Sequence, residues 1–280
     1  MYFCIHNLQQ MGKNLVNIMI ISLLSCFLTG CAGYNRILRS ADHEYKYEMA
    51  KSLFIEGRNS TAASLLEESL TMYNGKANAA QAIFLLANCY YNMGDYVSAA
   101  HYFRNYYRSF PNENQAEFAM FMSGKSLYLD TPDPRLDQTS TRTAIAEFQN
   151  FLDTYPYGKH AKEAGDMIYE MYDRLVEKEY RSAQLYYNLG NYMGNNYQSS
   201  IMVARNALIE YPYSKYREEL SILILKSQFK MAQESVIEKK LDRYRAAIDE
   251  YYSFINDFPD SKFRQEADKI FKSANKYVNN

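Results

Sequence analysis

The feature that most constrains this chain is a recurring aromatic–proline step. Four of its six prolines directly follow Phe or Tyr, in the pairs Phe110-Pro111, Tyr155-Pro156, Tyr211-Pro212 and Phe258-Pro259. Proline disfavours the helical conformation in the residue before it, so each step ends a helical run. Between the steps, apolar residues recur at helical spacing, and turn residues such as those at 57–59 and 94–96 divide each interval into two runs. The sequence therefore predicts an array of helix pairs.

Composition agrees with an all-α chain that has a substantial core. Of the 280 residues, 48% are hydrophobic and 22% are charged, which excludes wholesale disorder. Only 11 glycines and 6 prolines are present, too few for the turns of an all-β sandwich or barrel. The formal net charge of -1 leaves no basic surplus for phosphates. No nucleic-acid partner is expected.

The first 30 residues have the pattern of an export signal peptide. An uncharged apolar stretch, LVNIMIISLLSCFL, covers residues 15–28 and follows Lys13, the one charged residue of this segment. Its length suits a signal-peptide core, whereas a transmembrane helix needs about 20 residues. Translation starts either at Met1 or at Met11, because residues 1–10 add nothing to this signal.

Residues 28–31 have the sequence LTGC, which resembles the lipobox of bacterial lipoproteins. The resemblance implies cleavage between Gly30 and Cys31, acylation of Cys31 with palmitate-type chains, and a lipid-anchored tether over residues 31–40. Each buried methylene of such chains contributes about 0.8 kcal/mol to membrane binding. Once the leader is removed and Cys31 is acylated, Cys89 is the one free cysteine, and it is expected to be a small core residue. The alternative is a buried helix with an incidental cysteine.

The helix pairs resemble the tetratricopeptide repeat, two antiparallel helices in about 34 residues. The second unit matches best, at Ile83, Leu86, Ala87, Tyr90, Gly94, Tyr96, Ala99, Phe103 and Pro111. The resemblance implies a right-handed superhelical solenoid of about five helix pairs, in one domain over residues 41–278, with a capping helix at 261–278. The sequence departs from the repeat in an inserted loop at 130–135 and in a 56-residue step from Pro156 to Pro212, which requires a longer or additional helix. Ser214 and Ser261 are predicted to cap the helices that follow them.

No pattern of catalytic chemistry is present. The histidines after the leader, His43, His101 and His160, lack the spacing of a metal site. Gly124-Lys125-Ser126 imitates the end of a phosphate loop but lies in a helical pattern, with Ala119 where the first glycine is needed. No GxSxG motif occurs. We therefore expect neither an enzyme nor a metal or cofactor.

A lipobox followed by five such units resembles the BamD family, the lipoprotein subunits of the outer-membrane β-barrel assembly machinery. The more specific stretches are Asp133-Pro134-Arg135, Arg174-Leu175 with Glu179-Tyr180, and Tyr211-Pro212 with Glu219-Leu220. The Tyr- and Asn-rich composition is similar to the Bacteroidetes branch. The resemblance implies an outer-membrane lipoprotein that faces the periplasm, binds the BamA barrel subunit and other machinery components, and helps to fold and insert barrel proteins.

Two other functions are compatible with a lipid-anchored repeat protein. A generic periplasmic scaffold in envelope maintenance or cell division has the same fold, and fold alone does not decide function. A glycan-binding lipoprotein can also be built on such helices, although this chain has no Trp for sugar stacking.

Two sets of exposed residues are candidate binding sites. At the Tyr211 turn, Tyr213, Lys215 and Arg217 are candidates for the BamA contact, although this turn is equally suited to capping a helix. In the first three units, small residues at 37-residue intervals, Ala50, Ala87 and Gly124, are each flanked by rings, namely Tyr47, Phe54, Phe84, Tyr91, Phe121 and Tyr128. These six share one helical stripe, which predicts an aromatic groove for aromatic-ended segments of unfolded barrel proteins. The alternative is that the rings pack between successive first helices.

Overall fold

The computed structural model describes residue 40, residues 42–73 and residues 78–279. The predicted signal peptide, Cys31 and nearly all of the tether lie outside the described residues. Within these ranges all regular secondary structure is helical, which confirms the all-α prediction. The contacts divide the chain into two compact units, one up to Ser126 and one from Leu127 onward. The single solenoid over residues 41–278 therefore stays a prediction.

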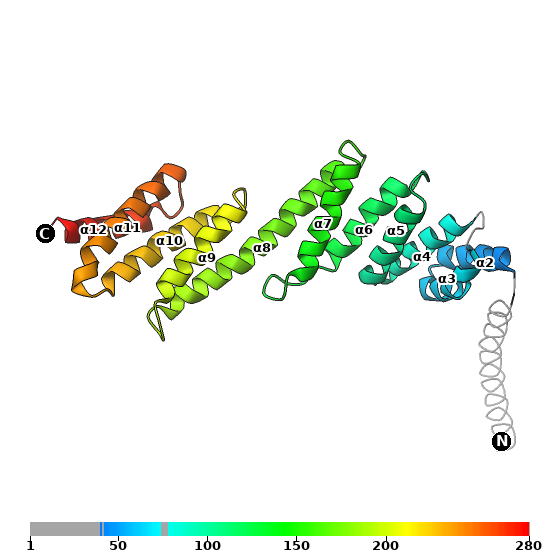
Figure 1. Ribbon diagram of the computed structural model, residues 1–280, viewed down its shortest axis with the longest axis horizontal. Helices are drawn as coiled ribbons and strands as arrows, with labels where there is room; N and C mark the ends of the chain where they lie inside the picture. The colour runs from blue at the N-terminus through cyan, green and yellow to red at the C-terminus, as the bar shows by residue number, and fades with distance from the viewer. Residues whose placement is uncertain (1–39, 41, 74–77, 280) are drawn as a thin grey trace, which may run out of the picture. The chain divides into compact units, whose positions relative to one another are not determined.

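The first unit is a series of antiparallel helices in the predicted pairs (Figure 1). It contains α2 (His43–Ile55), α3 (Asn59–Tyr73), α4 (Ala79–Met93), α5 (Tyr96–Ser109) and most of α6 (Ala116–Leu129). Consecutive helices pack against each other from α2 through α3 and α4 to α5. Sequential packing of this kind is what repeat proteins use to bury a continuous core.

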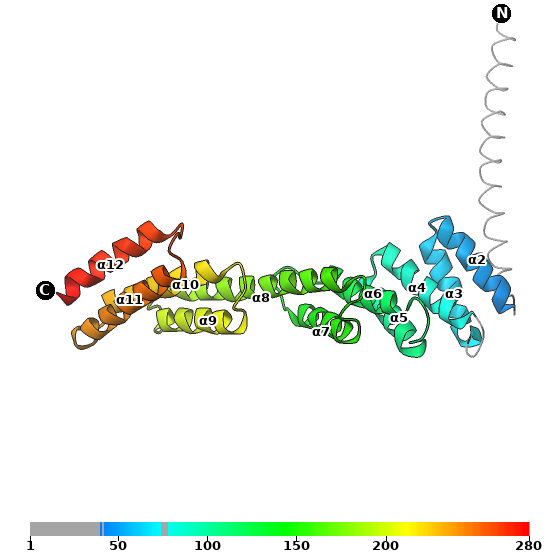
Figure 2. The same ribbon diagram turned by 90° about the horizontal axis from the view of Figure 1, so that it is seen from above.

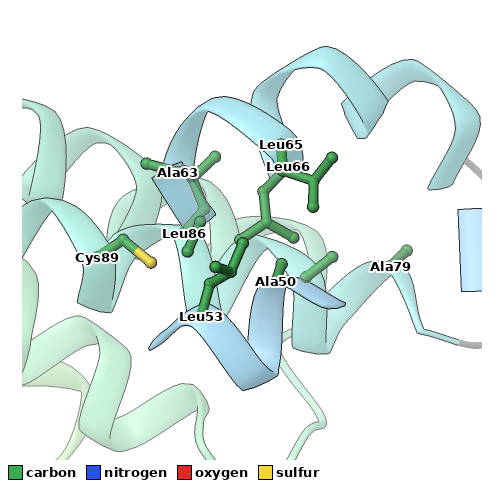
Figure 3. Close-up of a cluster of buried hydrophobic side chains, with 10 residues drawn as sticks. Ala50, Leu53, Ala63, Leu65, Leu66, Ala79, Leu86 and Cys89 are labelled. Atoms are coloured by element: carbon green, nitrogen blue, oxygen red, sulfur yellow. The ribbon is translucent and has the colours of Figure 1, made fainter. Parts of the chain in front are cut away.

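The core of the first unit is built from small and branched side chains of three helices (Figure 3). Ala50 and Leu53 of α2 meet Leu66 of α3 and Leu86 and Cys89 of α4, and all five are at most 5% exposed. Burial of one such leucine contributes about 1.5–3 kcal/mol. Burial also raises the pKa of the Cys89 thiol to about 12. The prediction that Cys89 is a core residue is confirmed.

The second unit contains the remaining helix pairs and a closing helix (Figures 1 and 2). Its helices are α7 (Thr139–Thr154), α8 (Ala161–Leu189), α9 (Asn196–Glu210), α10 (Arg217–Gln233), α11 (Ile237–Asp257) and α12 (Arg264–Val278). The 29 residues of α8 account for the long proline-to-proline step, so the helix is longer and no extra helix is inserted. α12 buries Ala267 and Ala274, and Phe271 stacks on Tyr251 of α11 with ring centroids 4.5 Å apart. The predicted capping helix is confirmed.

The four aromatic–proline steps adopt one backbone conformation. Phe110, Tyr155, Tyr211 and Phe258 each end a helix with φ between -129° and -133° and ψ between 59° and 69°. In each case the aromatic carbonyl then accepts the N–H three residues on, at 3.0–3.2 Å. The proline ring forces this departure from the α region, as the sequence predicted.

In the turns inside the helix pairs, an Asp or Asn side chain caps the second helix, and in the second pair a glycine ends the first helix. α4 ends at Gly94 with φ 76°, a left-handed conformation that favours glycine, and the Asp95 carboxylate then accepts the Ser98 N–H at 3.0 Å. Asn195 does the same for α9 with the Gln198 N–H at 3.3 Å.

The predicted caps at Ser214 and Ser261 are wrong in their position. The cap positions are Tyr216 and Phe263, two residues after the serines, and the helices begin directly after them. Each serine Oγ instead accepts the N–H of that later residue, at 3.2 and 2.9 Å, inside the turn. Each serine hydroxyl also donates to a carboxylate of the preceding first helix, Asp173 or Glu218. The serines therefore fasten the turns to the neighbouring repeat.

Candidate functional site

A groove of about 390 Å³ lies on the first unit, between the first helices of two successive pairs. The four residues from α2 and the four from α4 each recur at spacings of one, three or four positions along their helix. This spacing places each set on one face of its helix. The lining residues are Tyr47, Lys51, Phe54 and Ile55 from α2, Gln81, Phe84, Leu85 and Asn88 from α4, and Gln115 before α6.

The groove combines apolar rings with uncharged amides. Ile55 is 82% exposed, and Tyr47 and Phe54 are half-buried. The Lys51 ammonium lies 5.4 Å from the Tyr47 ring centroid and donates to Glu48 at 2.9 Å. Partial burial raises the pKa of the Tyr47 hydroxyl, so it stays protonated at neutral pH. Such a surface suits an extended peptide that has apolar side chains.

Phe84 is held in place by an aromatic cluster beneath the groove. Its ring centroid lies 5.7 Å from Phe103, 5.2 Å from Tyr106 and 6.3 Å from Phe118. Edge and tilted contacts of this kind each contribute about 0.5–1.5 kcal/mol beyond burial. The groove therefore has a rigid aromatic floor.

The other three rings of the predicted stripe lie in different surroundings. Tyr91 is half-buried and meets Tyr96 edge-on at 5.7 Å. Phe121 is 1% exposed, and the Lys125 ammonium lies 5.5 Å from its ring centroid. Tyr128 belongs to the second unit, where its hydroxyl donates to Glu170 at 2.6 Å. Of the six stripe residues, only Tyr47, Phe54 and Phe84 line this groove.

The burial of Phe121 has a physical cause in its helix. α6 buries residues on most of its faces, including Ala119, Met120, Met122 and Gly124. A helix covered on several sides leaves no open stripe for its rings.

In the second unit, the inserted loop is fastened to α8. The Arg174 guanidinium lies 5.0 Å from the Tyr128 ring centroid, donates to Glu170 at 2.8 Å and donates to the Thr131 hydroxyl. One turn further along α8, Lys178 donates to the Leu136 carbonyl at 3.1 Å. Arg174 thus connects two stretches that the sequence singled out separately.

Glu170 and Glu177 of α8 are held in the charged form. The Tyr128 hydroxyl and then Arg174 lower the pKa of Glu170. Arg181 and then the Tyr216 hydroxyl act in the same way on the pKa of Glu177. Both carboxylates therefore serve as acceptors at neutral pH.

The Tyr211 turn places its three candidate contact residues differently. Tyr213 is 86% exposed. Lys215 is exposed but tied to α8, with its N–H 3.1 Å and its ammonium 3.6 Å from Asp173 oxygens. The Arg217 guanidinium lies 5.6 Å from the Phe258 ring centroid. Only Tyr213 projects from the turn without such a tie.

Sequence reasoning missed the residues that complete the groove between its rings. Lys51, Ile55 and Leu85 lie one helical turn or one residue from the predicted rings, and Gln81 and Asn88 flank Phe84 at three- and four-residue spacing. Their helical spacing from the rings would have predicted them as lining residues, but the predicted stripe contained aromatic residues alone.

Comparison with known proteins supplies the family. A family model described as an outer membrane lipoprotein, YfiO, matches residues 39–195, more than half of the chain. The chain belongs to the YfiO family of outer membrane lipoproteins. A curated relative from Aquifex aeolicus, named as outer membrane protein assembly factor BamD, is 25% identical over 221 residues. That match covers 78% of this chain and 70% of the relative.

One solved structure is also similar, the TPR domain of P58(IPK). It is 14% identical to this chain and superimposes with a TM-score of 0.26. The match covers 91% of this chain and 62% of that structure, so the chain spans less than two thirds of its length. The family assignment therefore rests on the sequence comparisons. The Bacteroidetes origin suggested by composition stays a prediction.

Among the helices that the structure describes, none combines the length and apolarity needed to cross a membrane. Within the same residues, no group of three His, Cys, Asp or Glu side chains is placed to hold a metal ion.

Proposed function

We propose that this protein is a lipid-anchored scaffold of outer-membrane protein assembly, facing the periplasm. The observation that carries the proposal is the YfiO family match over residues 39–195, together with an assembly-factor relative that covers most of the chain. The role is non-catalytic: the described residues combine docking grooves with a stack of helices, and the buried Cys89 thiol is not accessible as a nucleophile.

Acylation of Cys31 anchors the chain to the inner face of the outer membrane. The support is the LTGC sequence after the apolar core of residues 15–28. Cys31→Ser is expected to give an uncleaved or soluble species that does not incorporate a palmitate analogue, with Cys89→Ala as the matched control that still labels. Outer-membrane fractionation and labelling of Cys31→Ser would refute this step.

The second unit contacts a BamA-like barrel subunit through the Tyr211 turn. Tyr213 offers an exposed ring, and aromatic side chains are enriched at the centres of interfaces. Lys215 and Arg217 supply polar contacts at its edge. Charge reversal of both is expected to weaken co-purification with the barrel subunit while helicity is kept. Because Lys215 also holds the turn, charge reversal at Lys262, which pairs with Glu219 at 2.5 Å in the next turn, is the matched control.

The groove of the first unit receives aromatic-ended segments of unfolded barrel proteins. Tyr47, Phe54 and Phe84 give a large contact area that loses little conformational entropy on binding. The amide side chain of Gln81 lies beside them, where an extended peptide has backbone groups to satisfy. The Asn88 amide nitrogen donates to the Phe84 carbonyl at 2.7 Å, which leaves its oxygen to accept.

The decisive experiment is crosslinked affinity capture of the full chain from native membranes, followed by mass spectrometry. A barrel-forming assembly subunit and barrel precursors are the expected partners. Recovery of cell-division or envelope-maintenance proteins without the barrel subunit would overturn the proposal in favour of a generic scaffold.

A further inference from the structure

A second pocket, of about 300 Å³, lies wholly in the second unit and has a different chemistry from the groove. Residues of α8 form one wall, and the Tyr211 turn forms the other. Four tyrosines and two carboxylates define it, namely Tyr169, Tyr172, Tyr211, Tyr213, Asp173 and Glu210. Lysine and arginine are absent from this described lining.

The pocket has a fixed floor and an open rim. The Tyr172 and Tyr211 rings lie 5.5 Å apart at the floor, and the Tyr211 hydroxyl donates to Glu210 at 2.6 Å. Burial and this hydrogen bond raise the pKa of Tyr211 to about 12, so its hydroxyl stays a donor. At the rim, Tyr169 is 62% and Tyr213 is 86% exposed. The rim rings are therefore free to close over an incoming group.

The corresponding turn one repeat later, at Phe258-Pro259, has the same serine–carboxylate bond but an arginine of the chain itself beside its ring. Ser214 donates to Asp173, and Ser261 donates to Glu218 in the same way one repeat later. The residue before Asp173 is Tyr172, whereas the residue before Glu218 is Arg217. The Arg217 guanidinium lies 5.6 Å from the ring of Phe258, the counterpart of Tyr211. In that repeat the space beside the ring holds a guanidinium.

A second arginine of this unit contacts both an aromatic ring and a carboxylate. Arg174, one residue after Asp173, lies over the Tyr128 ring at 5.0 Å and pairs with Glu170 at 2.8 Å. Within the second unit, a guanidinium thus lies beside an aromatic ring at two places, and at one of them it also pairs with a carboxylate. At the pocket, the Arg142 guanidinium donates to the Tyr211 hydroxyl at 3.4 Å from outside and does not belong to the lining, so the space between the rings and the carboxylates is open.

We propose that this pocket binds the guanidinium of an arginine presented by a partner polypeptide. A guanidinium is planar, stacks on tyrosine faces and pairs with carboxylates through two parallel hydrogen bonds. The compact, strongly hydrated ammonium of lysine meets only part of this geometry. The site is separate from the groove of the first unit but shares Tyr213 with the barrel-subunit contact proposed above. Its test uses arginine peptides and no barrel subunit, so the two proposals can fail independently.

Two cations face the pocket's carboxylates from outside. Arg142 of α7 lies 3.8 Å from Glu210, and the Lys215 ammonium lies 3.6 Å from Asp173. Their side chains are 59% and 65% exposed, so these long pairs are strongly screened by solvent. The Asp173 side chain is only 22% exposed, so a guanidinium that enters the pocket meets one carboxylate that is well shielded from solvent, where its attraction is stronger.

The test is a titration of the full chain in detergent, with labelled tyrosines observed by NMR. The probes are the blocked tripeptides Gly-Arg-Gly, Gly-Lys-Gly and Gly-Gln-Gly. The arginine peptide is expected to shift the tyrosine resonances of the pocket and to bind about fivefold or more tightly than the lysine peptide, with no binding of the glutamine peptide at the same concentrations.

Three variants locate the binding. Tyr172→Arg recreates the Arg217 arrangement and is expected to abolish arginine-peptide binding by filling the pocket from within. Tyr213→Ala, at an exposed rim position that folding does not need, is expected to weaken binding about fivefold. Tyr157→Ala is the matched control, since Tyr157 follows the Tyr155-Pro156 step in the same motif, is 99% exposed and does not line this pocket.

The outcomes separate the alternatives. Unchanged arginine-peptide binding in both Tyr172→Arg and Tyr213→Ala, at wild-type helicity, overturns the proposal. Equal binding of the glutamine peptide also overturns it, because the pocket then recognises backbone and not charge. If Tyr172→Arg does not fold, Tyr213→Ala alone decides.

Discussion

The aromatic stripe of α2 and α4 and its continuation in α6 carry the same sequence spacing but end in different surroundings. Tyr47, Phe54 and Phe84 line an open groove of the first unit. Phe121 of α6 is only 1% exposed. Tyr128, seven residues later, is covered within the second unit by Arg174.

The comparison teaches that spacing selects a helix face, whereas neighbouring elements decide whether that face is open. α2 and α4 are packed mainly through their alanines and leucines, which leaves their ring stripe uncovered. In α6, burial extends to most faces. A repeated motif is therefore weaker grounds for a binding surface than the burial of each copy.

The largest expected effect concerns stability. Phe121→Ala is expected to lower the free energy of unfolding by about 3–5 kcal/mol, because it leaves a cavity at a fully buried ring. Phe54→Ala, at a half-buried groove position, is expected to cost about 1 kcal/mol. Urea unfolding followed by circular dichroism measures both. Equal losses would mean that the groove rings are core residues, and the comparison would fail.

The next effect tests how Tyr128 is covered. Arg174→Ala is expected to cost about 2 kcal/mol, because it removes charge-assisted hydrogen bonds to Glu170 and Thr131. Hydrogen exchange is expected to accelerate in the loop at 130–138. Arg181→Ala is the matched control, since Arg181 pairs with Glu177 on the same helix but is 54% exposed. Similar exchange in both variants would show that Arg174 does not hold the loop.

A binding measurement sharpens the comparison further. Tyr47→Ala with Phe54→Ala is expected to weaken binding of a barrel-derived, aromatic-ended peptide at least tenfold, about 1.4 kcal/mol. Tyr91→Ala with Tyr128→Ala is expected to have a smaller effect, because those rings do not line the groove. Fluorescence anisotropy with a labelled peptide reports both affinities. The reverse order of effects would place the peptide elsewhere.

The smallest effect is a dependence on pH in the second unit. The folded pKa of Glu170 lies below its ordinary value of 4.5, so its contribution to stability is complete above that value. That contribution is lost as the pH falls through the folded pKa. Hydrogen exchange in the loop at 130–138, corrected for its intrinsic pH dependence, is therefore expected to accelerate below about pH 4.5. Glu170→Gln removes the titrating group, and persistence of the same pH dependence in that variant would assign it to another residue.

The sequence by itself determined the elements of this protein and most of their ends. Proline before the next repeat excludes the α conformation at Phe110, Tyr155, Tyr211 and Phe258, and this local steric rule holds whatever surrounds it. The left-handed turn at Gly94 and the amphipathic closing helix are likewise local consequences of residue type and spacing. The helix pairs and the capping helix were predictable for that reason.

Only the tertiary structure decided which rings are open, where the serines of the turns bond, and how an arginine of α8 connects two distant motifs. Phe121 and Phe84 occupy equivalent sequence positions, yet one is interior and the other lines a groove. Ser214 reaches Asp173 across 41 residues of sequence, and Arg174 reaches Thr131 across 43. Burial and long-range hydrogen bonds depend on elements brought together by folding, and a periodic pattern along one helix carries no information about what covers it.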